Sequence, residues 1–257
     1  MKRIAIVTGA SSGMGRRFAQ TAGENASFDE LWVIARREER LLQLKKELEP
    51  QTVVPIAMDL GVKENIALLG ERLNKENAEV VLLVNAAGFG KFQAVLDVPQ
   101  DVADQMLALN CGALMDMCYT CLPFMKRGAK ILNIASVAAF QPVPYIAEYA
   151  ATKAFVLSFS RALWKELHAD GITVTALCPY WTRTEFFNVS NTNTSKDRVS
   201  YFNAMYEAED LVRRGWRDLK RGRDVSTYGF IARAQLVLVK LLPHRLVMHV
   251  WCKQQKQ

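Results

Sequence analysis

The chain has few of the residues that mark secreted or metal-binding proteins. It contains five cysteines, an odd number at irregular spacing, and three histidines. Cys118 and Cys121 form a CxxC pair, but the apolar residues around them repeat with helical spacing, and no second cysteine or histidine pair accompanies them. We therefore expect buried thiols in a protein of the reducing cytoplasm, and no metal site.

Long hydrophobic runs are also missing. The apolar run near the N-terminus, IAIVT at 4–8, ends too soon to be a signal peptide. The apolar stretch 236–251 is interrupted by Lys240, Pro243, His244 and Arg245, so it falls short of the ~20 residues that span a bilayer. We expect no membrane span but a helix packed on the body or on a partner, with peripheral membrane contact as the alternative.

Basic stretches interleaved with aromatic residues do not occur, although the formal net charge is +7. Arginines cluster at 16–17, 36–37, 213–214 and 221–223. Charge alone would permit nucleic-acid binding, but without a recognition motif we expect none. An anionic small-molecule cofactor explains the first two clusters more simply.

Short apolar runs rich in valine and isoleucine alternate with segments of helical spacing. The runs are continuous, which is typical of strands buried on both faces of a parallel sheet. They occupy residues 4–8, 31–35, 53–57, 80–84, 130–135 and 173–178. This pattern predicts one doubly wound, Rossmann-type α/β domain over 1–257, with a parallel sheet of about seven strands and helices on both faces. We expect the polar segment 182–224 to form a lid and 229–257 an apolar helical tail.

A glycine-rich turn, TGASSGMG at 8–15, lies between the first strand and the first helix. There it would offer free N–H groups and a positive dipole end to a phosphate. Four more motifs follow in order: NAAG at 85–88, Asn110, Ser136 and YAATK at 149–153. Together they resemble the short-chain dehydrogenase/reductase family, closely over about residues 3–185. Within it, the chain resembles the branch that holds carbonyl, hydroxysteroid and long-chain 3-ketoacyl reductases.

Tyr149 and Lys153 are four positions apart, so on a helix they lie on the same face. A free phenol has a pKa near ~10 and is a poor base at neutral pH, but a nearby cation would lower that pKa. The resemblance implies that Tyr149 is the general acid or base and that Lys153 supplies the cation and binds the nicotinamide ribose. It also implies that Ser136 holds the substrate oxygen and that Asn110 holds a water linking Lys153 to solvent.

The second strand ends at Ala35 and is followed by Arg36 and Arg37, whereas a carboxylate at this place would suit NAD. Because arginine binds phosphate with two charge-assisted hydrogen bonds, we expect NADP(H), with Arg36 the strongest contact and Arg16 a further one. The other cofactor contacts implied by the resemblance are Gly9, Ser11, Ser12, Gly13, Met14, Gly15, Asp59, Leu60, Asn85, Ala86, Ala87, Gly88, Tyr149, Lys153, Pro179, Tyr180, Thr182 and Thr184.

One stretch departs from the family pattern. The family has Pro-Gly after the sixth strand, whereas this chain has Pro179-Tyr180-Trp181. Tyr180 therefore either points into the substrate cleft or reshapes the nicotinamide end of the cofactor site. We expect a broad apolar cleft that suits a steroid, a bile acid or an acyl chain. Its expected lining is Phe140, Tyr145, Tyr180, Trp181, Phe186 and Phe187.

Three functions agree with these residues. The first is an NADP(H)-dependent oxidoreductase that acts on a hydrophobic ketone or secondary alcohol, such as a steroid or bile acid. The second is a 3-oxoacyl thioester reductase, which would need a basic rim, with Arg213, Arg214 and Arg217 as candidates. The third is a non-catalytic NADP(H)-binding sensor or scaffold. The resemblance also implies a homodimer or homotetramer, formed through the helices within 101–125 and 145–168.

Overall fold

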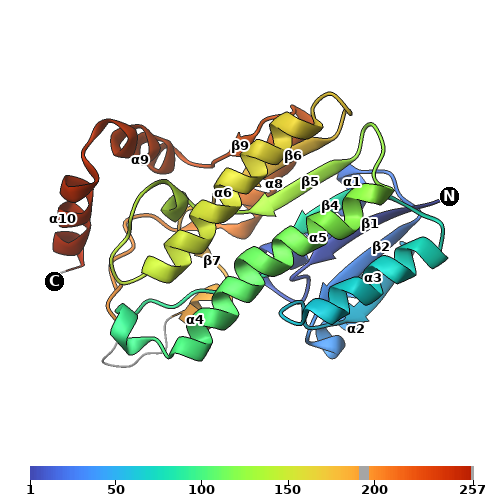
Figure 1. Cartoon of the computed structure of the whole chain (residues 1–257), viewed down its shortest axis with the longest axis horizontal. Coiled ribbons are helices and arrows are strands. Elements are labelled where there is room, and N and C mark those ends of the chain that lie inside the picture. The colour runs from blue at the N-terminus through green and yellow to red at the C-terminus, as the bar shows by residue number, and fades with distance from the viewer. Residues whose placement is uncertain (191–196, 256–257) are drawn as a thin grey trace.

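A computed structural model describes residues 1–190 and 197–255. Its core is a parallel sheet of seven strands in the order β3-β2-β1-β4-β5-β6-β9, which confirms the doubly wound Rossmann-type fold (Figure 1). The strands are β1 (Lys2–Thr8), β2 (Glu30–Ala35), β3 (Val53–Ala57), β4 (Ala78–Asn85), β5 (Lys130–Ile134), β6 (Thr173–Leu177) and β9 (Val225–Ser226). Order reverses between β1 and β4, and such switch points bind ligands at the carboxyl ends of the strands.

Helices cover both faces of the sheet because successive strand residues point to opposite sides. On β1, Ile4 and Ile6 join one core cluster, while Ala5 and Val7 join the other. The first cluster includes residues of α3 (Lys63–Lys75), α5 (Leu114–Cys121) and α6 (Ala147–Leu167). The second includes residues of α1 (Gly13–Asn25), α2 (Glu38–Glu47) and α8 (Ala208–Lys220). Two buried layers therefore hold the sheet from both sides.

One long helical stretch, Gln100–Phe124, combines α4 (Gln100–Leu107), a π-helical turn (Ala108–Ala113), α5 and a short 3-10 turn (Leu122–Phe124). By length and composition alone it could cross a membrane. Its Met117, Cys118 and Cys121 are buried in the core between the sheet and the neighbouring helices. We therefore interpret it as a core helix of this domain.

The remaining elements lie at the carboxyl ends of the strands. They are two short 3-10 helices, η1 (Val95–Asp97) and η4 (Val137–Phe140), the paired strands β7 (Thr182–Arg183) and β8 (Tyr206–Glu207), and the helices α7 (Phe186–Ser190), α9 (Phe230–Leu241) and α10 (His244–Gln254). In Figure 1, α9 and α10 stand at the end of the molecule to which the strand β5 points. They form the expected helical tail.

The expected lid at 182–224 is shorter in the structure. Its second half is α8, whose Val212, Trp216 and Leu219 are buried against the sheet. These apolar residues repeat with helical spacing, so α8 is a core helix and cannot move as a cover. Only the part before α8 can serve as a lid, and residues 191–196 of that part lie outside the described residues.

Candidate active site

The glycine-rich turn joins β1 to α1 and leaves the start of that helix free to bind an anion. Gly9 and Gly13 have positive φ angles of 66° and 54°, which glycine adopts without strain. At Gly9, a Cβ atom would lie 2.8 Å from the backbone of Ala86, so the turn packs directly on the end of β4. The N-cap Ser12 makes no side-chain capping bond. The first N–H groups of α1 therefore fit the pyrophosphate of a dinucleotide.

The end of β4 is held against this turn by a threonine and an asparagine. Thr8 Oγ1 accepts hydrogen bonds from the N–H groups of Ala86 and Ala87, at 3.0 and 3.2 Å. The Asn85 side chain, expected at the cofactor, is turned into the core instead. Its Nδ2 donates to Asn133 Oδ1 at 2.9 Å, which ties β4 to β5. Asn85 thus holds the end of β4 in place beside the expected cofactor site, although its side chain does not face that site.

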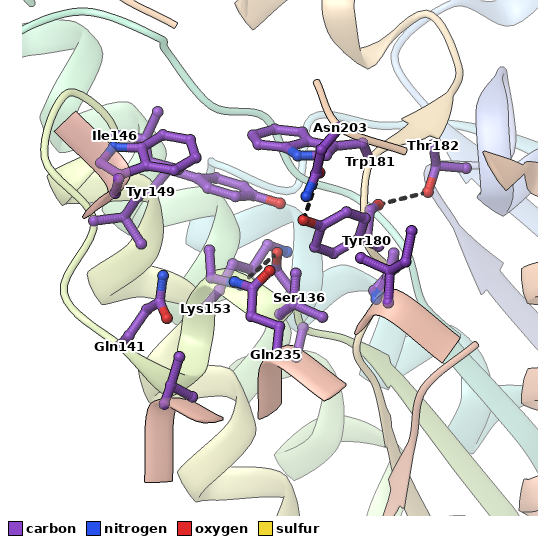
Figure 2. Close-up of a pocket in the computed structure, with 18 of the residues that line it drawn as sticks. Ser136, Gln141, Ile146, Tyr149, Lys153, Tyr180, Trp181, Thr182, Asn203 and Gln235 are labelled. Carbon is purple, nitrogen blue, oxygen red and sulfur yellow. Dashed lines mark hydrogen bonds between the residues drawn. The ribbon is translucent and has the colours of Figure 1, made fainter. Parts of the chain in front are cut away.

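Ser136, Tyr149 and Lys153 meet in one cavity at the ends of β5 and β6 (Figure 2). Ser136 follows β5. Its hydroxyl oxygen accepts the N–H of Ala138 at 3.1 Å, and its own O–H lies within hydrogen-bonding reach of the Tyr149 phenol. Tyr149 and Lys153 lie on one face of α6, as their spacing predicts. The ammonium Nζ of Lys153 is 5.7 Å from the centre of the Tyr149 ring.

The pKa of Tyr149 differs from the sequence-based expectation. Burial raises this pKa to about 12, and the nearby Ser136 hydroxyl only partly offsets the effect. The desolvation cost is larger because the hydration that the phenolate loses on burial exceeds the stabilisation that neighbouring groups provide. The Lys153 ammonium lies 5.7 Å from the ring centre and donates to the carbonyl oxygen of Ile134 at 2.7 Å, and the cost of burial outweighs any attraction between the ammonium and the phenolate. At neutral pH the phenol is therefore protonated and ready to act as an acid.

Lys153 is itself buried, and burial lowers its pKa to about 8. Below that pH the side chain is a cation beside the phenol, and above it the side chain becomes neutral. Lys153 therefore loses its charge at a pH just above the physiological range. Small changes in its surroundings would determine whether it is protonated at a given pH.

Asn110 lies in the π-helical turn between α4 and α5 and is fully buried. Its Nδ2 donates to the carbonyl oxygen of Phe89 at 2.8 Å and its Oδ1 accepts the N–H of Phe89 at 3.0 Å. A Cβ at Gly88 would lie 2.8 Å from Asn110 Oδ1 and 3.6 Å from Lys153 Nζ. The side chain thus clamps the Gly88–Phe89 backbone beside Lys153. The water that the resemblance assigns to Asn110 stays a prediction.

Arg37 is the arginine best placed beside the start of α1. Its guanidinium donates to the hydroxyl oxygens of Ser11 and Ser12, at 3.0 and 2.9 Å. It also pairs with Glu185, which follows β7, at 3.1 Å, and Glu185 pairs with Arg40 at 2.9 Å. Positive charge therefore gathers next to a helix N-terminus, an arrangement that suits a phosphate.

The other residues predicted to contact the adenosine half of the cofactor do not contact the turn before α1 as Arg37 does. Arg36 is exposed, and its guanidinium makes no hydrogen bond or ion pair within 1–190 or 197–255. Arg16 is turned to α2, where it pairs with Glu47 at 2.7 Å. Asp59 is exposed at the end of β3, whereas Leu60 is buried in the core, and the contacts of both residues with the cofactor stay predictions. In this structure Arg37, and not Arg36, contacts the turn before α1, and the expectation that Arg36 makes the strongest phosphate contact stays a prediction.

The cavity above the catalytic residues has a volume of about 480 Å³ and mostly apolar walls. Tyr180, Trp181, Phe186 and Phe187 line it as expected. Tyr180 points into the cleft and its hydroxyl donates to Asn203 Oδ1 at 2.7 Å (Figure 2). This volume falls within the range of small-molecule sites. Six of the residues expected at the cofactor also line this cavity: Met14, Ala86, Gly88, Pro179, Thr182 and Thr184.

The first three-quarters of the chain match a family model. Residues 3–195 match the model described as short chain dehydrogenase. The chain is a short-chain dehydrogenase/reductase. Members of this family transfer hydride with a nicotinamide cofactor, so the chain is an NAD(P)-dependent oxidoreductase.

Individual relatives agree with this assignment. The very-long-chain 3-oxoacyl-CoA reductase of Anas platyrhynchos is 31% identical over 263 residues, covering 98% of this chain and 80% of its own. A short-chain dehydrogenase from Sphingobium yanoikuyae in complex with NADPH is 27% identical, with a TM-score of 0.76 over 95% of this chain and 96% of that one. A short-chain dehydrogenase/reductase from Burkholderia phymatum in complex with NAD has a TM-score of 0.79 over 92% of both chains, and at 20% identity it shows the fold alone.

Two expected cleft residues of this oxidoreductase lie elsewhere. Phe140 packs on the core beneath the cleft, and Tyr145 packs on the cluster around Phe92. Neither lines the cavity in the described part of the chain. Their positions in the sequence, just before the α6 helix, gave no information on side-chain direction. Arg213, Arg214 and Arg217 do not line the cavity either, and Arg214 pairs with Asp218 of its own helix at 2.5 Å.

Sequence reasoning also missed a large part of the cavity wall. Residues of α9 and α10 form it: Phe230, Ile231, Ala234, Gln235, Leu238, Val239, Leu242, Leu246, Val247, Val250, Trp251 and Gln254. Trp251 is anchored by a hydrogen bond from its Nε1 to the carbonyl oxygen of Pro144 at 2.9 Å. Gln141 and Gln235 add amide groups to the cavity (Figure 2). The apolar spacing of 230–251 was the available signal for this wall.

Gly90 is a further functional residue that the sequence did not reveal. A Cβ at this position would lie 2.7 Å from Cδ2 of the Tyr149 ring and 3.1 Å from Phe186. The hydrogen of glycine is therefore what allows the ring of Tyr149 to lie where it does. Gly90 follows the NAAG motif by two residues, but nothing in the sequence points from it to Tyr149.

Proposed function

We propose that this protein is an NADP(H)-dependent oxidoreductase that interconverts a hydrophobic ketone and its secondary alcohol. The observation that carries the proposal is the position of Ser136, Tyr149 and Lys153 on the floor of an apolar cavity. Three polar groups of a carbonyl-reducing site at the base of apolar walls suit a substrate with a single reacting oxygen on a large apolar body.

Ser136, Tyr149 and Lys153 have different roles in the reduction. The Ser136 hydroxyl donates its proton to a hydrogen bond with the substrate carbonyl oxygen and holds that oxygen beside Tyr149. A reduced nicotinamide bound beside these residues would supply the hydride that the carbonyl carbon takes up. Tyr149 gives its phenolic proton to the oxygen, completing the alcohol, and the Lys153 cation stabilises the phenolate that remains. The reverse reaction uses the phenolate as the base.

Preference for NADP(H) is supported by Arg37. Its guanidinium lies beside two hydroxyls and the start of α1, where the adenosine end of the cofactor would place a 2′-phosphate. The solved complex of the Sphingobium relative contains NADPH, which agrees with this preference. No carboxylate follows β2 directly, since Ala35 precedes two arginines.

The size and chemistry of the cavity favour a bulky apolar substrate such as a steroid, a bile acid or a long acyl chain. Aromatic side chains of the β6–α7 segment form one wall and aliphatic side chains of α9 and α10 form the other. Asn203, Gln141 and Gln235 bring a few amides into these walls, and Gln141 Oε1 is buried with no partner among the described residues. A second polar group on the substrate would satisfy it.

A 3-oxoacyl thioester is the second candidate substrate. It is favoured by the Anas platyrhynchos relative, a 3-oxoacyl-CoA reductase that aligns over almost all of this chain. The expected basic rim at Arg213, Arg214 and Arg217 does not support it, because none of these side chains lines the cavity. A non-catalytic sensor is less favoured, since the complete set of reacting groups faces one cavity.

We further propose a cytoplasmic homodimer or homotetramer. The outer faces of α4–α5 and α6 lie side by side and expose Leu107, Tyr119 and Phe155. Exposed apolar side chains on adjacent helices suit an interface between identical subunits.

The proposed function is tested by following the loss of NADPH or NADH absorbance with a panel of substrates. The panel pairs ketosteroids and oxo-bile acids with a 3-oxoacyl thioester. We expect NADPH-selective turnover of a ring ketone. Turnover of the thioester alone would replace the leading substrate class by the second one, and NADPH binding without any turnover would favour the sensor.

A further inference from the structure

The two C-terminal helices expose an unusual amount of apolar surface. We call residues 230–254, which comprise α9 and α10, the C-terminal hairpin. Phe230 is 86% exposed, Leu241 75% and Val237 58%. On α9, positions 230, 234, 237, 238 and 241 repeat with helical spacing, so they form one apolar face. Its residues 230, 234 and 238 border the substrate cavity, whereas Val237 and Leu241 lie outside the cavity lining. Soluble surfaces rarely carry so continuous an apolar stripe without a partner.

All charges on this hairpin have the same sign. The sequence from 225 to 257 contains no aspartate or glutamate. Lys240, Arg245 and Lys253 are exposed, and none of them forms an ion pair within the described part of the chain. Arg233 and Lys240 are seven positions apart on α9, which is about two helical turns, so both lie on one side of the helix beside the apolar face. The hairpin thus combines apolar and cationic side chains on one surface.

The substrate cavity opens within this same surface. Phe230, Leu238, Leu242 and Leu246 line the cavity, yet each is also exposed to solvent. Residues that face both the cavity and the exterior mark its mouth. A ligand that enters here passes over apolar side chains rather than through water. In Figure 1 the hairpin stands out from the body, which leaves its outer face accessible.

We propose that the C-terminal hairpin docks on an anionic lipid bilayer and that the cavity takes its substrate from the membrane. Cations beside an apolar helical face match the negative surface and the acyl layer of such a bilayer. A second copy of this chain fits less well, because a two-fold interface would bring the hairpin's cations against one another with no acidic partner. A soluble phosphate would use the cations but leave the apolar stripe uncovered.

Docking itself stands apart from the proposed reaction, whereas delivery of the substrate rests on the proposed function. The docked face would bury Val237, Leu241 and Phe230 in the interfacial layer while the cations contact lipid phosphates. The mouth of the cavity would then open to the acyl chains. A lipophilic ketone could thus reach Tyr149 without crossing water, where it is poorly soluble.

Vesicle co-sedimentation tests the docking with no need for a substrate. The full-length protein is mixed with phosphatidylcholine vesicles, either pure or with about 30% phosphatidylserine. We expect binding to the anionic vesicles and little to the neutral ones. Lys240→Gln with Arg245→Gln should lower the partition coefficient by about 25-fold, since each cation near an anionic surface contributes about a factor of five. Lys45→Gln with Lys46→Gln removes the same charge from α2 and should have little effect.

The apolar face is tested by Val237→Gln with Leu241→Gln, which should lower the partition coefficient at least tenfold. Leu68→Gln, at a 57% exposed position of α3, is the matched control. Neither substituted residue lines the cavity, so turnover of a small water-soluble ketone should stay unchanged and shows that the variants fold. Failure of the proposed reaction would leave these vesicle results untouched.

Three outcomes would overturn the proposal. The first is equal, weak binding of the wild-type protein to both vesicle types. The second is conversion of a wild-type dimer to a monomer by Val237→Gln with Leu241→Gln, which would make the stripe a subunit interface. The third is absence of vesicle binding together with weaker binding of free coenzyme A by Lys240→Gln with Arg245→Gln, which would make the cations a site for a soluble phosphate.

Discussion

At the scale of single residues, the electrostatics of Tyr149 and Lys153 decide how the site responds to pH. Burial raises the pKa of Tyr149 to about 12, so the phenol stays protonated across the neutral range. Burial lowers the pKa of Lys153 to about 8, so its charge is lost within a range that assays reach easily. Tyr149, the proton donor, therefore keeps its protonation state across the neutral range, and Lys153 beside it is the group that titrates.

This difference predicts the pH profile of the reductive reaction. The rate should be high below pH about 8 and fall as Lys153 loses its proton, because the phenolate formed at Tyr149 is then no longer stabilised by a cation. The measurement is kcat for ketone reduction as a function of pH. Lys153→Arg keeps its charge at all accessible pH values, so this variant should lose the alkaline limb even if its rate is lower. A limb that persists in the variant would contradict the assignment.

Gly90 gives a second prediction at this scale. Gly90→Ala places a methyl group 2.7 Å from the Tyr149 ring, which must move away from Ser136. A displaced general acid loses much of its contribution, so kcat should fall by about 10- to 100-fold while the Kd for NADPH stays unchanged. Gly112→Ala, where a Cβ would meet nothing within 4 Å, is the control. Normal kcat in Gly90→Ala would show that the ring tolerates the contact.

Sequence reasoning reached the catalytic residues because five motifs occur in the order of a known family, and because the spacing of Tyr149 and Lys153 puts these two on one helix face. It did not predict the directions in which side chains point. Asn85 is turned into the core by Asn133, and Phe140 and Tyr145 pack away from the cavity. Each of these outcomes depends on a partner far away in the sequence, so no local pattern could have revealed it.

At the scale of elements, the junctions around the start of α1 should determine cofactor choice. Arg37 reaches the hydroxyls of Ser11 and Ser12, while Arg36 faces solvent. Arg37→Ala should raise the Kd for NADPH by roughly 10- to 100-fold through loss of charge-assisted hydrogen bonds, and leave the Kd for NADH nearly unchanged. Arg36→Ala should have a smaller effect. Fluorescence titration of both variants with both cofactors checks this order, and the opposite order would restore the sequence-based ranking.

Glu185 offers the converse test. Its carboxylate pairs with Arg37 and Arg40 and so competes with a phosphate for their guanidiniums. Both partners are substantially exposed, so the pair is weak. Glu185→Gln should therefore tighten NADPH binding by up to about fivefold and leave NADH binding unchanged. Weaker NADPH binding in this variant would mean that Glu185 instead holds Arg37 in its binding position.

Element boundaries were predictable where the apolar pattern was continuous, as in β1 to β6. The extent of the lid was not predictable, because the polar composition of 182–224 gives no sign of the core helix within it. Leu211, Val212, Trp216 and Leu219 repeat with helical spacing within α8, but charged residues between them dominate its composition. The pairing of β7 with β8 joins residues more than twenty positions apart and left no local signal.

At the scale of the whole molecule, the C-terminal hairpin closes the substrate cavity of a fold that would otherwise be open. The sequence predicted an apolar tail but not the wall that it forms, because only the tertiary fold brings Trp251 against Pro144 and Trp181. The substrate range should therefore depend on residues some hundred positions away from the catalytic serine and tyrosine.

Trp251 provides the test of this dependence. Trp251→Ala removes the hydrogen bond to Pro144 and the stacking on Trp181. KM for a bulky ring ketone should rise by about tenfold or more, since an apolar contact of this size is lost, whereas KM for a small ketone should change little. Steady-state kinetics with the two ketones measures the difference. Equal changes for both would indicate general loosening of the site rather than loss of one wall.

The central claim is that Tyr149 protonates a carbonyl in a reaction that uses NADPH. The most direct test compares the wild-type protein with Tyr149→Phe in two measurements, NADPH binding and NADPH oxidation with a hydrophobic ring ketone. We expect equal Kd values and a loss of kcat of about 10²- to 10⁴-fold in the variant. Unchanged kcat in Tyr149→Phe, or NADPH binding by the wild-type protein without turnover of any carbonyl, would contradict the account.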